Sequence, residues 1–192
     1  NQICNAGLIY GALATLERSP EFCKEIITKA IDSNKSAQKI YEPEGGYPQG
    51  YDAWSHSTCF EVMLVAALQS ALDTDAGIKS QKSFMHTADF MTYMVAPSNM
   101  AYNYFDSGSN CYPLPAKYWF ARENGDASIV AIDERLLASG KIHADRLLPL
   151  QILFGAGVDM SEAKLPSENS WSAKGEVPLY IYRSGWNNAN DT

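Results

Sequence analysis

The chain has 192 residues, enough for about one domain whose core needs neither disulfides nor a metal for stability. Hydrophobic residues make up 46% of the sequence and charged residues 19%, as in ordinary globular proteins. The net charge is −7 and Lys and Arg form no cluster, which excludes nucleic acid as a general partner but not a local basic pocket for an acidic sugar. No apolar run approaches the roughly 18 residues needed to span a membrane.

Helical spacing of apolar residues begins at the first residues of the chain. The first predicted helix runs to about Arg18, and its many small residues indicate close helix–helix contact. Ser19, Pro20 and Glu21 then supply an N-cap, a proline at the first helical position and an early acidic residue. They predict a second helix that ends near Tyr41.

Between residues 44 and 61, glycines and a proline alternate with aromatic and ionisable side chains. The glycines permit backbone conformations that other residues avoid, and the proline stiffens the path. Aromatic faces and hydroxyls suit a sugar ring, and tyrosine with histidine suits proton transfer, so this loop is a candidate functional site. The alternative is an ordinary helix-entry loop whose aromatic residues cover the edge of the core. The candidate residues are Tyr47, Tyr51, Trp54 and His56.

Thr58 and Glu61 have the spacing of a capping box, which predicts that a third helix begins there and runs to about Leu72. A fourth helix is predicted over residues 82–95, where methionines recur among other apolar residues as gap-filling core side chains. A long loop over residues 97–115 follows.

Three short helices are predicted after this loop, over residues 116–123, 126–139 and 145–154. Asp126 supplies the N-cap of the second one. Antiparallel helix pairs with short turns, and with long loops on one side, fit an incomplete (α/α) toroid. They fit a compact bundle equally well. The fold class is therefore mainly α, with the toroid as the finer prediction.

Residues 177–183 alternate in the way a half-buried strand does. A single strand has no partner in an all-helical domain, so its partners are expected beyond Thr192, in a β-sandwich domain that this chain lacks. The chain is accordingly interpreted as an excerpt of a longer polypeptide. Its predicted parts are a partial toroid over residues 1–154, a linker over 155–176 and the start of a truncated β domain over 177–192.

The four cysteines are widely separated and form no Cys-x-x-Cys pair, which argues against a zinc ribbon or a redox motif. Three of them lie in helical patterns where cysteine acts as a small hydrophobic residue, so free thiols are expected. His86 and His143 have no partner at ligand spacing, and structural roles are favoured for both. Neither a metal site nor a cofactor is predicted within this chain.

Six segments spread along the chain form an ordered set: residues 1–7 (NQICNAG), 42–50 (EPEGGYPQG), 54–55 (WS), 102–108 (YNYFDSG), 146–150 (RLLPL) and 182–186 (YRSGW). In order and spacing this set resembles the helical domain of heparinase II/III-like polysaccharide lyases. The last segment resembles the first strand of that family's C-terminal β domain. The resemblance implies an incomplete (α/α) toroid joined to an antiparallel β-sandwich, in a bacterial enzyme that acts on uronic-acid polysaccharides.

In that family a base removes the C5 proton of a uronate, donors stabilise the charge that develops on its carboxylate, and an acid protonates the leaving glycosidic oxygen. The resemblance assigns proton transfer to Tyr51 and His56. The family usually carries tyrosine at the position of His56, so either proton transfer has passed to His56 or Tyr51, or catalysis has been lost. The same resemblance assigns substrate binding to Asn1, Asn5, Tyr47, Trp54, Tyr104 and Asp106.

The resemblance further implies an acidic polysaccharide as the partner, a periplasmic or extracellular location, and a zinc ion only in the missing β domain. Turnover is expected of the full-length protein and not of this chain alone. Two alternatives stay open. One is a glycoside hydrolase on an α/α toroid that uses Asp52 or Asp106 with Glu61. The other is a non-catalytic carbohydrate-binding or scaffolding protein, suggested by His56 in place of the usual tyrosine.

Overall fold

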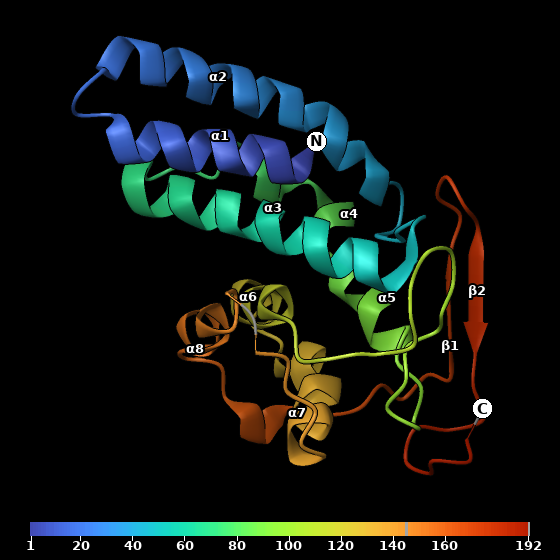
Figure 1. Cartoon of the computed structure of the whole chain (residues 1–192). Helices are drawn as coiled ribbons and strands as arrows, with labels where there is room; N and C mark the ends of the chain where they lie inside the picture. The colour runs from blue at the N-terminus through green and yellow to red at the C-terminus, as the bar shows by residue number, and fades with distance from the viewer. Residues whose placement is uncertain (145, 192) are drawn as a thin grey trace.

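The computed structural model describes residues 1–144 and 146–191, and it is mainly helical. Its longest helices form one layer, in which the first helix contacts the other two (Figure 1). Pro20 occupies the first position of the second helix, as the sequence predicts. The three helices are α1 (Gln2–Thr15), α2 (Pro20–Ala37) and α3 (Gly50–Leu72), and the 3-10 turn η1 (Gln38–Tyr41) extends α2.

The start of α3 differs from the prediction. The helix begins at Gly50, so Thr58 and Glu61 lie in its interior, where both are fully buried. The Thr58 hydroxyl is 3.0 Å from the hydroxyl of Tyr41, and Glu61 accepts hydrogen bonds from buried amide groups. The predicted capping box is wrong because these two side chains have their partners in other helices rather than at a helix end.

The helix predicted over residues 82–95 is interrupted at His86. Directly after it, the Thr87 hydroxyl donates to the Gly45 carbonyl (2.6 Å) and accepts from the Trp54 indole (2.8 Å). Contacts with distant segments therefore fix the chain at the break. The elements in this region are the 3-10 turn η2 (Ile78–Ser80), α4 (Lys82–Met85) and α5 (Thr87–Tyr93).

The smaller helices form a second group below the long ones in Figure 1. Asp126 accepts a hydrogen bond from the Ser128 backbone (2.9 Å), which confirms the predicted N-cap. Of the helix predicted over residues 145–154, residue 145 lies outside the described residues and the helix itself begins at Pro149. The elements are α6 (Pro115–Asn124), η3 (Ala127–Val130), α7 (Ala131–Ala138), α8 (Pro149–Gly155) and η4 (Met160–Glu162).

Two short strands, β1 (Ser170–Ala173) and β2 (Leu179–Tyr182), form an antiparallel hairpin in which Trp171 lies opposite Ile181. The expectation that the second strand has no partner within the chain is therefore wrong, because β1 lies in the segment expected to be a linker. The Trp171 ring packs 5.6 Å from the ring of Phe90, so burial against α5 holds the hairpin in place.

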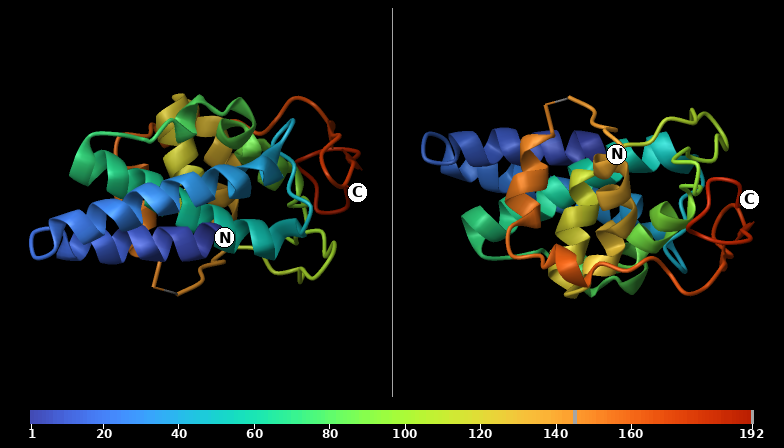
Figure 2. Two further views of the ribbon diagram at one scale, coloured as in Figure 1. Left: turned by 90° about the horizontal axis from the view of Figure 1, so that it is seen from above. Right: turned by 90° about the horizontal axis from the view of Figure 1, so that it is seen from below.

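Arg183, directly after β2, anchors the hairpin to the helices. Its guanidinium is fully buried, donates to the carbonyls of Val95 (2.8 Å) and Tyr93, and lies 3.9 Å from the centre of the Trp186 ring. Figure 2 shows the hairpin beside the loop that precedes α3. There the Glu44 carboxylate accepts a hydrogen bond from the backbone after β1, at 2.6 Å.

These elements confirm a mainly helical chain, while the closure of the helices into a toroid stays a prediction. The four cysteines all lie among the described residues, and none of them is in a disulfide. Among the described residues, no helix has both the length and the apolar character required to cross a membrane.

Candidate functional site

The loop between η1 and α3 follows a path that only glycine allows at two points. Gly45 has φ +85°, and a Cβ there would lie 2.9 Å from the Thr87 Cα. Gly50 has φ +80°, and a Cβ there would lie 2.5 Å from the Tyr104 carbonyl oxygen. Both positions combine a left-handed backbone with close backbone contact, so the glycines fix how the loop enters α3.

A reciprocal pair of hydrogen bonds joins the first turn of α3 to the loop that carries residues 104–112. The Asp52 backbone N–H donates to the Ser107 hydroxyl (3.0 Å), and the Gly108 N–H donates to the Asp52 carboxylate (2.8 Å). The Tyr104 hydroxyl donates to the Pro48 carbonyl. The distant loop thus satisfies a helix-end donor that a local N-cap residue usually satisfies.

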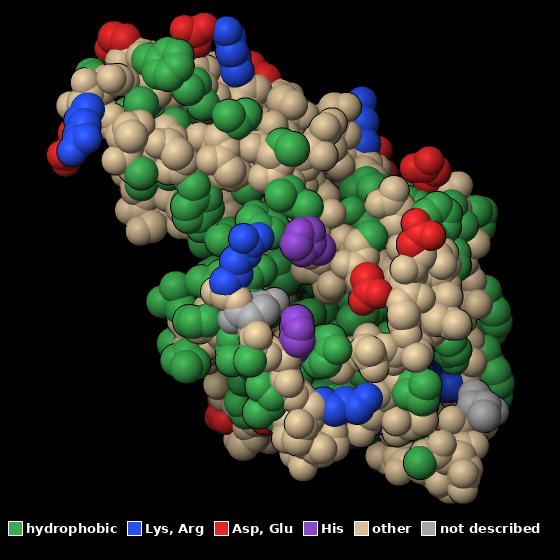
Figure 3. All heavy atoms as spheres, in the orientation of Figure 1, with side chains coloured by type: hydrophobic (Ala, Val, Ile, Leu, Met, Phe, Trp, Pro, Cys, Tyr) green, Lys and Arg blue, Asp and Glu red, His purple; other side chains and the backbone are tan. Residues whose placement is uncertain are grey.

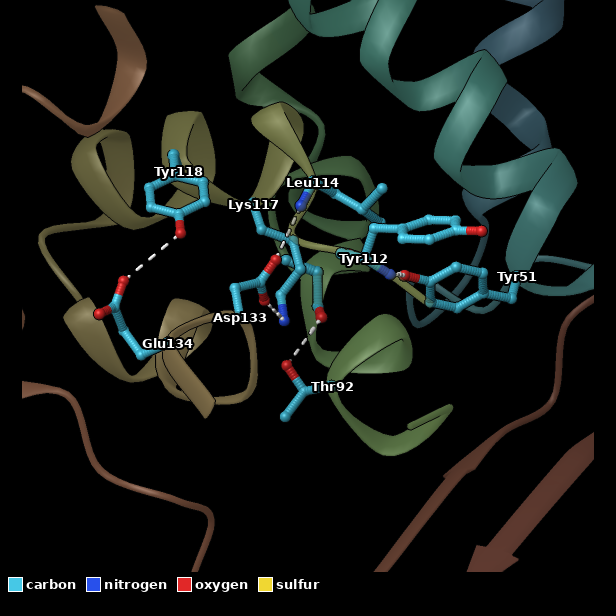
Figure 4. Close-up of polar contacts among 9 residues, drawn as sticks. Tyr51, Thr92, Tyr112, Leu114, Lys117, Tyr118, Asp133 and Glu134 are labelled. Carbon is cyan, nitrogen blue, oxygen red and sulfur yellow. Dashed lines mark hydrogen bonds and ion pairs between the residues drawn. The ribbon is translucent and has the colours of Figure 1, made fainter. Parts of the chain in front are cut away.

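Tyr51 makes a second connection to the same loop. Its hydroxyl donates to the Tyr112 carbonyl (3.0 Å) and accepts from the Tyr112 N–H (3.2 Å), as Figure 4 shows. Burial, followed by the negative charge of Asp133, raises the pKa of Tyr51 well above its usual value. Tyr51 therefore stays protonated near neutral pH and fixes the backbone at Tyr112.

Behind this loop, an ion pair buried on both sides joins Lys117 and Asp133. The Asp133 carboxylate also accepts from the Leu114 backbone (2.8 Å), so α6 and α7 hold the segment after Tyr112 in place (Figure 4). Neither Lys117 nor Asp133 lines the adjacent cleft, so the ion pair supports the wall of that cleft from behind.

A cleft of about 390 Å³ lies between α3 and the segments before α6 and α8. We call it the histidine cleft, because His56 and His143 both line it; Figure 3 shows two histidines flanking a hollow between the long helices and the smaller ones. The His143 ring stacks on the Tyr112 ring, with 4.6 Å between their centroids. The other lining residues include Tyr51, Asp52, Ser55, Cys59, Leu114, Leu147 and Gln151.

A cationic side chain lies beside the histidine cleft, separated from His56 by the Phe60 ring. The Arg146 guanidinium is 5.6 Å from the centre of the Phe60 ring, and the Phe60 ring is 5.3 Å from the ring of His56. His56 and Arg146 are both exposed, so they are open to a ligand. The cleft therefore brings together imidazoles and phenols, with a guanidinium beside it that can neutralise a carboxylate.

Asn1 and Tyr47 line a different pocket, of about 430 Å³, which we call the amide pocket. It lies between the start of α1, the end of α2 and the loop before α3. The Tyr47 hydroxyl donates to the Gln2 side chain (3.4 Å), whose amide donates to the Tyr41 hydroxyl (2.6 Å). The remaining lining residues are Ser36, Ala37, Lys39, Ile40, Gln49, Ser57 and Glu176.

The structure places four other predicted site residues away from both pockets. Trp54 is 0% exposed and packs in the core, and the buried Asn5 amide donates to Asn34 (3.3 Å). Tyr104 is half-buried, with its hydroxyl bonded to a carbonyl, and Asp106 is exposed. Tyr51 and His56 thus line one cavity, and Asn1 and Tyr47 line another. The eight predicted residues do not share a single cavity.

Glu61 belongs to the core and faces neither pocket. Its Oε1 accepts from Asn34 (2.5 Å) and Gln38 (3.1 Å), and its Oε2 has no hydrogen-bond partner. Loss of hydration on burial raises its pKa from 4.5 to about 7, although the two amide hydrogen bonds oppose the shift.

The sequence analysis gives no individual site role to Tyr112, His143 or Arg146. His143 was assigned a structural role because no ligand-spaced partner is near it in the sequence. Its partners come from other segments, which only the folded chain brings together. Arg146 opens the RLLPL segment, the one sequence signal that pointed to this part of the cleft.

Among the described residues, no group of three or more His, Cys, Asp or Glu side chains is arranged to hold a metal ion. A scan against protein-family models and a search of curated proteins both found no match. The resemblance to heparinase II/III-like lyases therefore depends on the six quoted segments.

Proposed function

We propose that the protein is the helical, substrate-cleft part of a polysaccharide lyase that cleaves uronic-acid polymers by β-elimination. The observation that supports this proposal best is the meeting of His56, Tyr112 and His143, from three separate segments, around one open cleft that has Arg146 beside it. These groups match the demands of the reaction, which needs a base, an acid and a counter-charge for a carboxylate.

His56 is proposed as the base that removes the C5 proton. The electrons of that C–H bond form the C4–C5 double bond, and the bond from C4 to the glycosidic oxygen breaks. Tyr112, stacked on His143, is proposed as the acid that gives its proton to the leaving oxygen. Tyr51 is a positioning residue in this scheme, because its hydroxyl is bonded to the Tyr112 backbone.

Arg146 and His143 are proposed to neutralise the uronate carboxylate. Charge develops on that carboxylate when C5 loses its proton, and a nearby cation lowers the barrier by stabilising it. Asp52 also lines the cleft, but its carboxylate accepts a hydrogen bond from Gly108, which reduces its repulsion of a bound uronate.

The test is β-elimination by the full-length polypeptide, because the resemblance places further catalytic residues in a β domain. Heparan, chondroitin and alginate are incubated separately with the protein, and the absorbance of the unsaturated uronate is followed. His56→Gln is expected to lower kcat by about a hundredfold or more, the usual contribution of a general base. The control is His86→Gln, an exposed histidine outside the cleft, which should leave kcat unchanged. A folded wild type that gives no absorbance with any of the three polymers would reject the proposal.

A non-catalytic carbohydrate-binding protein is the second candidate, favoured by the bonds that occupy the Tyr51 hydroxyl. Binding of a uronate polymer without turnover in the full-length protein would support it. The glycoside-hydrolase alternative has no such observation. It needs two carboxylates that face one cleft, and Glu61 is buried in the core away from Asp52 and Asp106.

A further inference from the structure

The segment that carries Tyr112 along the histidine cleft has little backbone freedom. It reads Tyr-Pro-Leu-Pro over residues 112–115. Each proline has a fixed φ, and the residue before a proline is biased toward an extended conformation. Leu114 accordingly has φ −115° and ψ 124°, and α6 begins at Pro115. Because the segment is stiff, a contact that fixes Leu114 also limits where the Tyr112 ring can lie.

Two buried side chains hold this segment, one at each end. The Tyr51 hydroxyl is bonded to both backbone polar groups of Tyr112, at 3.0 and 3.2 Å. The Asp133 carboxylate accepts a hydrogen bond from the Leu114 N–H at 2.8 Å. That carboxylate is itself held, because Asp133 is buried and forms an ion pair with the equally buried Lys117 (Figure 4).

The segments that carry Tyr112 and His143 share an anchor point. The Cys111 thiol donates to the Asn99 carbonyl oxygen (3.2 Å), and the Lys141 ammonium donates to the same oxygen. Tyr112 directly follows Cys111, and His143 lies two residues after Lys141. Their rings stack with 4.6 Å between the centroids. The environment of the His143 ring therefore reports the position of the Tyr112 phenol.

The Lys117–Asp133 ion pair loses its hydration by being buried. Apolar residues in place of a buried ion pair often give equal or greater stability. Loss of hydration raises the pKa of Asp133, although the charge of Lys117 opposes the shift, so the pairing does not fully offset the effect of burial. Stability alone therefore does not account for the pair, whereas the Leu114 N–H requires an acceptor at this place.

We propose that Lys117 and Asp133 are positioning residues that hold the Tyr112 phenol against His143 in the histidine cleft. Asp133 acts through the Leu114 backbone, and Lys117 keeps the Asp133 carboxylate in place. Neither of them lines the cleft, so neither touches a bound ligand. The proton that Tyr112 gives to the leaving oxygen rests on the proposed function, but the position of its ring does not.

Two double variants separate the acceptor from the charges. Lys117→Met/Asp133→Leu makes the pair apolar and removes the acceptor for Leu114. Lys117→Met/Asp133→Asn also removes both charges, but it keeps an oxygen that can accept from Leu114. The control is Lys79→Met/Glu123→Gln, which removes a partly buried ion pair (2.5 Å) outside the cleft. Thermal melting followed by circular dichroism establishes that each variant is folded.

The first readout is the NMR chemical shift of the His143 ring protons in the full-length polypeptide, identified by their loss in His143→Gln. The ring current of a stacked phenol displaces these protons upfield, and Tyr112→Leu gives their shift without it. The apolar variant is expected to lose most of this displacement, while the asparagine and control variants keep it. An unchanged shift in the folded apolar variant would overturn the inference, and so would an equal loss in the control.

A measurement on the wild type decides the question if the apolar variant does not fold. In urea below the global unfolding transition, the Leu114 amide should lose its protection from hydrogen exchange together with the His143 displacement. A displacement that disappears while the Leu114 amide stays protected would overturn the inference.

The second readout is kinetic and distinguishes positioning from a purely structural role. The apolar variant is expected to lower kcat by about tenfold to a hundredfold with little change in KM, because a small displacement of the acid affects the transition state more than substrate binding. Lys117→Met/Asp133→Asn should recover most of kcat. If kcat is unchanged in the folded apolar variant, the inference fails and the lyase proposal stands. If the wild type shows no turnover but the His143 shifts change as expected, the lyase proposal fails and the positioning of Tyr112 is supported.

Discussion

Replacing Glu61 by glutamine is expected to increase the free energy of unfolding at pH 8, and to increase it by less than about 1 kcal/mol at pH 5. In the folded protein this carboxyl group is fully buried, and the two hydrogen bonds that it accepts come from neutral amides, Asn34 and Gln38. Its second oxygen has no hydrogen-bond partner. The amino group of Asn1 is the cation that favours the ionised form, and its effect is smaller than that of either amide, so ionisation occurs largely without the hydration that water provides in the unfolded chain.

The size of the effect follows from the difference between the two pKa values of Glu61. Burial raises the pKa to about 7 in the folded protein, against 4.5 as the ordinary value. The folded state therefore binds the proton of Glu61 more tightly than the unfolded state does. The stability that this protonated carboxyl contributes is fully present below pH 4.5 and is lost as the pH rises to about 7. At about 1.4 kcal/mol for each pKa unit, the wild type loses about 3 kcal/mol between these limits.

Glutamine at position 61 stays neutral at every pH and keeps an oxygen for the two amide donors. The variant should therefore not lose stability as the pH rises. At pH 8 its free energy of unfolding should exceed that of the wild type by about 3 kcal/mol. Urea denaturation at pH 5, 6, 7 and 8, followed by circular dichroism and by the fluorescence of the buried Trp54 and Trp119, measures the difference. The control is Glu17→Gln, at an exposed position just after α1. Its free energy of unfolding should depend on pH in the same way as that of the wild type.

The comparison between variants is needed because other buried groups also titrate. If the wild type and Glu61→Gln show the same pH dependence, the reasoning about an uncompensated buried carboxylate is refuted. A variant less stable than the wild type at pH 8 would refute it as well, because that result would mean that the amides stabilise the ionised form.

The remaining predictions concern the start of α3 and its contacts. Gly50→Ala should lower the free energy of unfolding by about 1–3 kcal/mol, because its Cβ would meet the Tyr104 carbonyl at φ +80°. Gly7→Ala, in α1 with nothing within 4 Å of its Cβ, should instead raise it by about 1 kcal/mol. Asp52→Ala removes the acceptor for Gly108 and should cost about 1 kcal/mol, with the mobility of the 104–112 loop increased in hydrogen exchange. Urea denaturation measures all three stabilities.

Local signals in the sequence were enough for elements whose ends depend on nearby residues. Pro20 begins α2 and Asp126 caps the turn before α7, as predicted, because in both cases the determining contacts lie within the same few residues. Thr58 and Glu61 show the limit of such signals. The same spacing serves a capping box or a buried polar cluster, and only the partners in α2 and η1 distinguish them.

Part of the candidate site was predictable because some of its residues are close together in the sequence. Tyr51 and His56 come from one loop and helix start, so sequence proximity placed them at one cleft. Tyr112 and His143 come together only in the folded chain, and no sequence motif around either residue predicts that their rings stack. The strand pairing of β1 also escaped prediction, since its four residues contain one large apolar side chain, Trp171, and no repeated alternation.

The contacts of α3 also explain why the fold tolerates histidine at position 56. The neighbouring Trp54 and Thr58 are bonded within the core and cannot change without loss of packing. His56 is exposed, and its ring makes an edge contact with the Phe60 ring, with 5.3 Å between the ring centroids. In the proposed lyase, tyrosine or histidine at this position would change the group that exchanges protons with the substrate and would leave the walls of the cleft in place. The side chain at this position can therefore vary on a fixed scaffold, because the hydrogen bonds that hold the start of α3 to the neighbouring loop come from residues 51, 52 and 104–112.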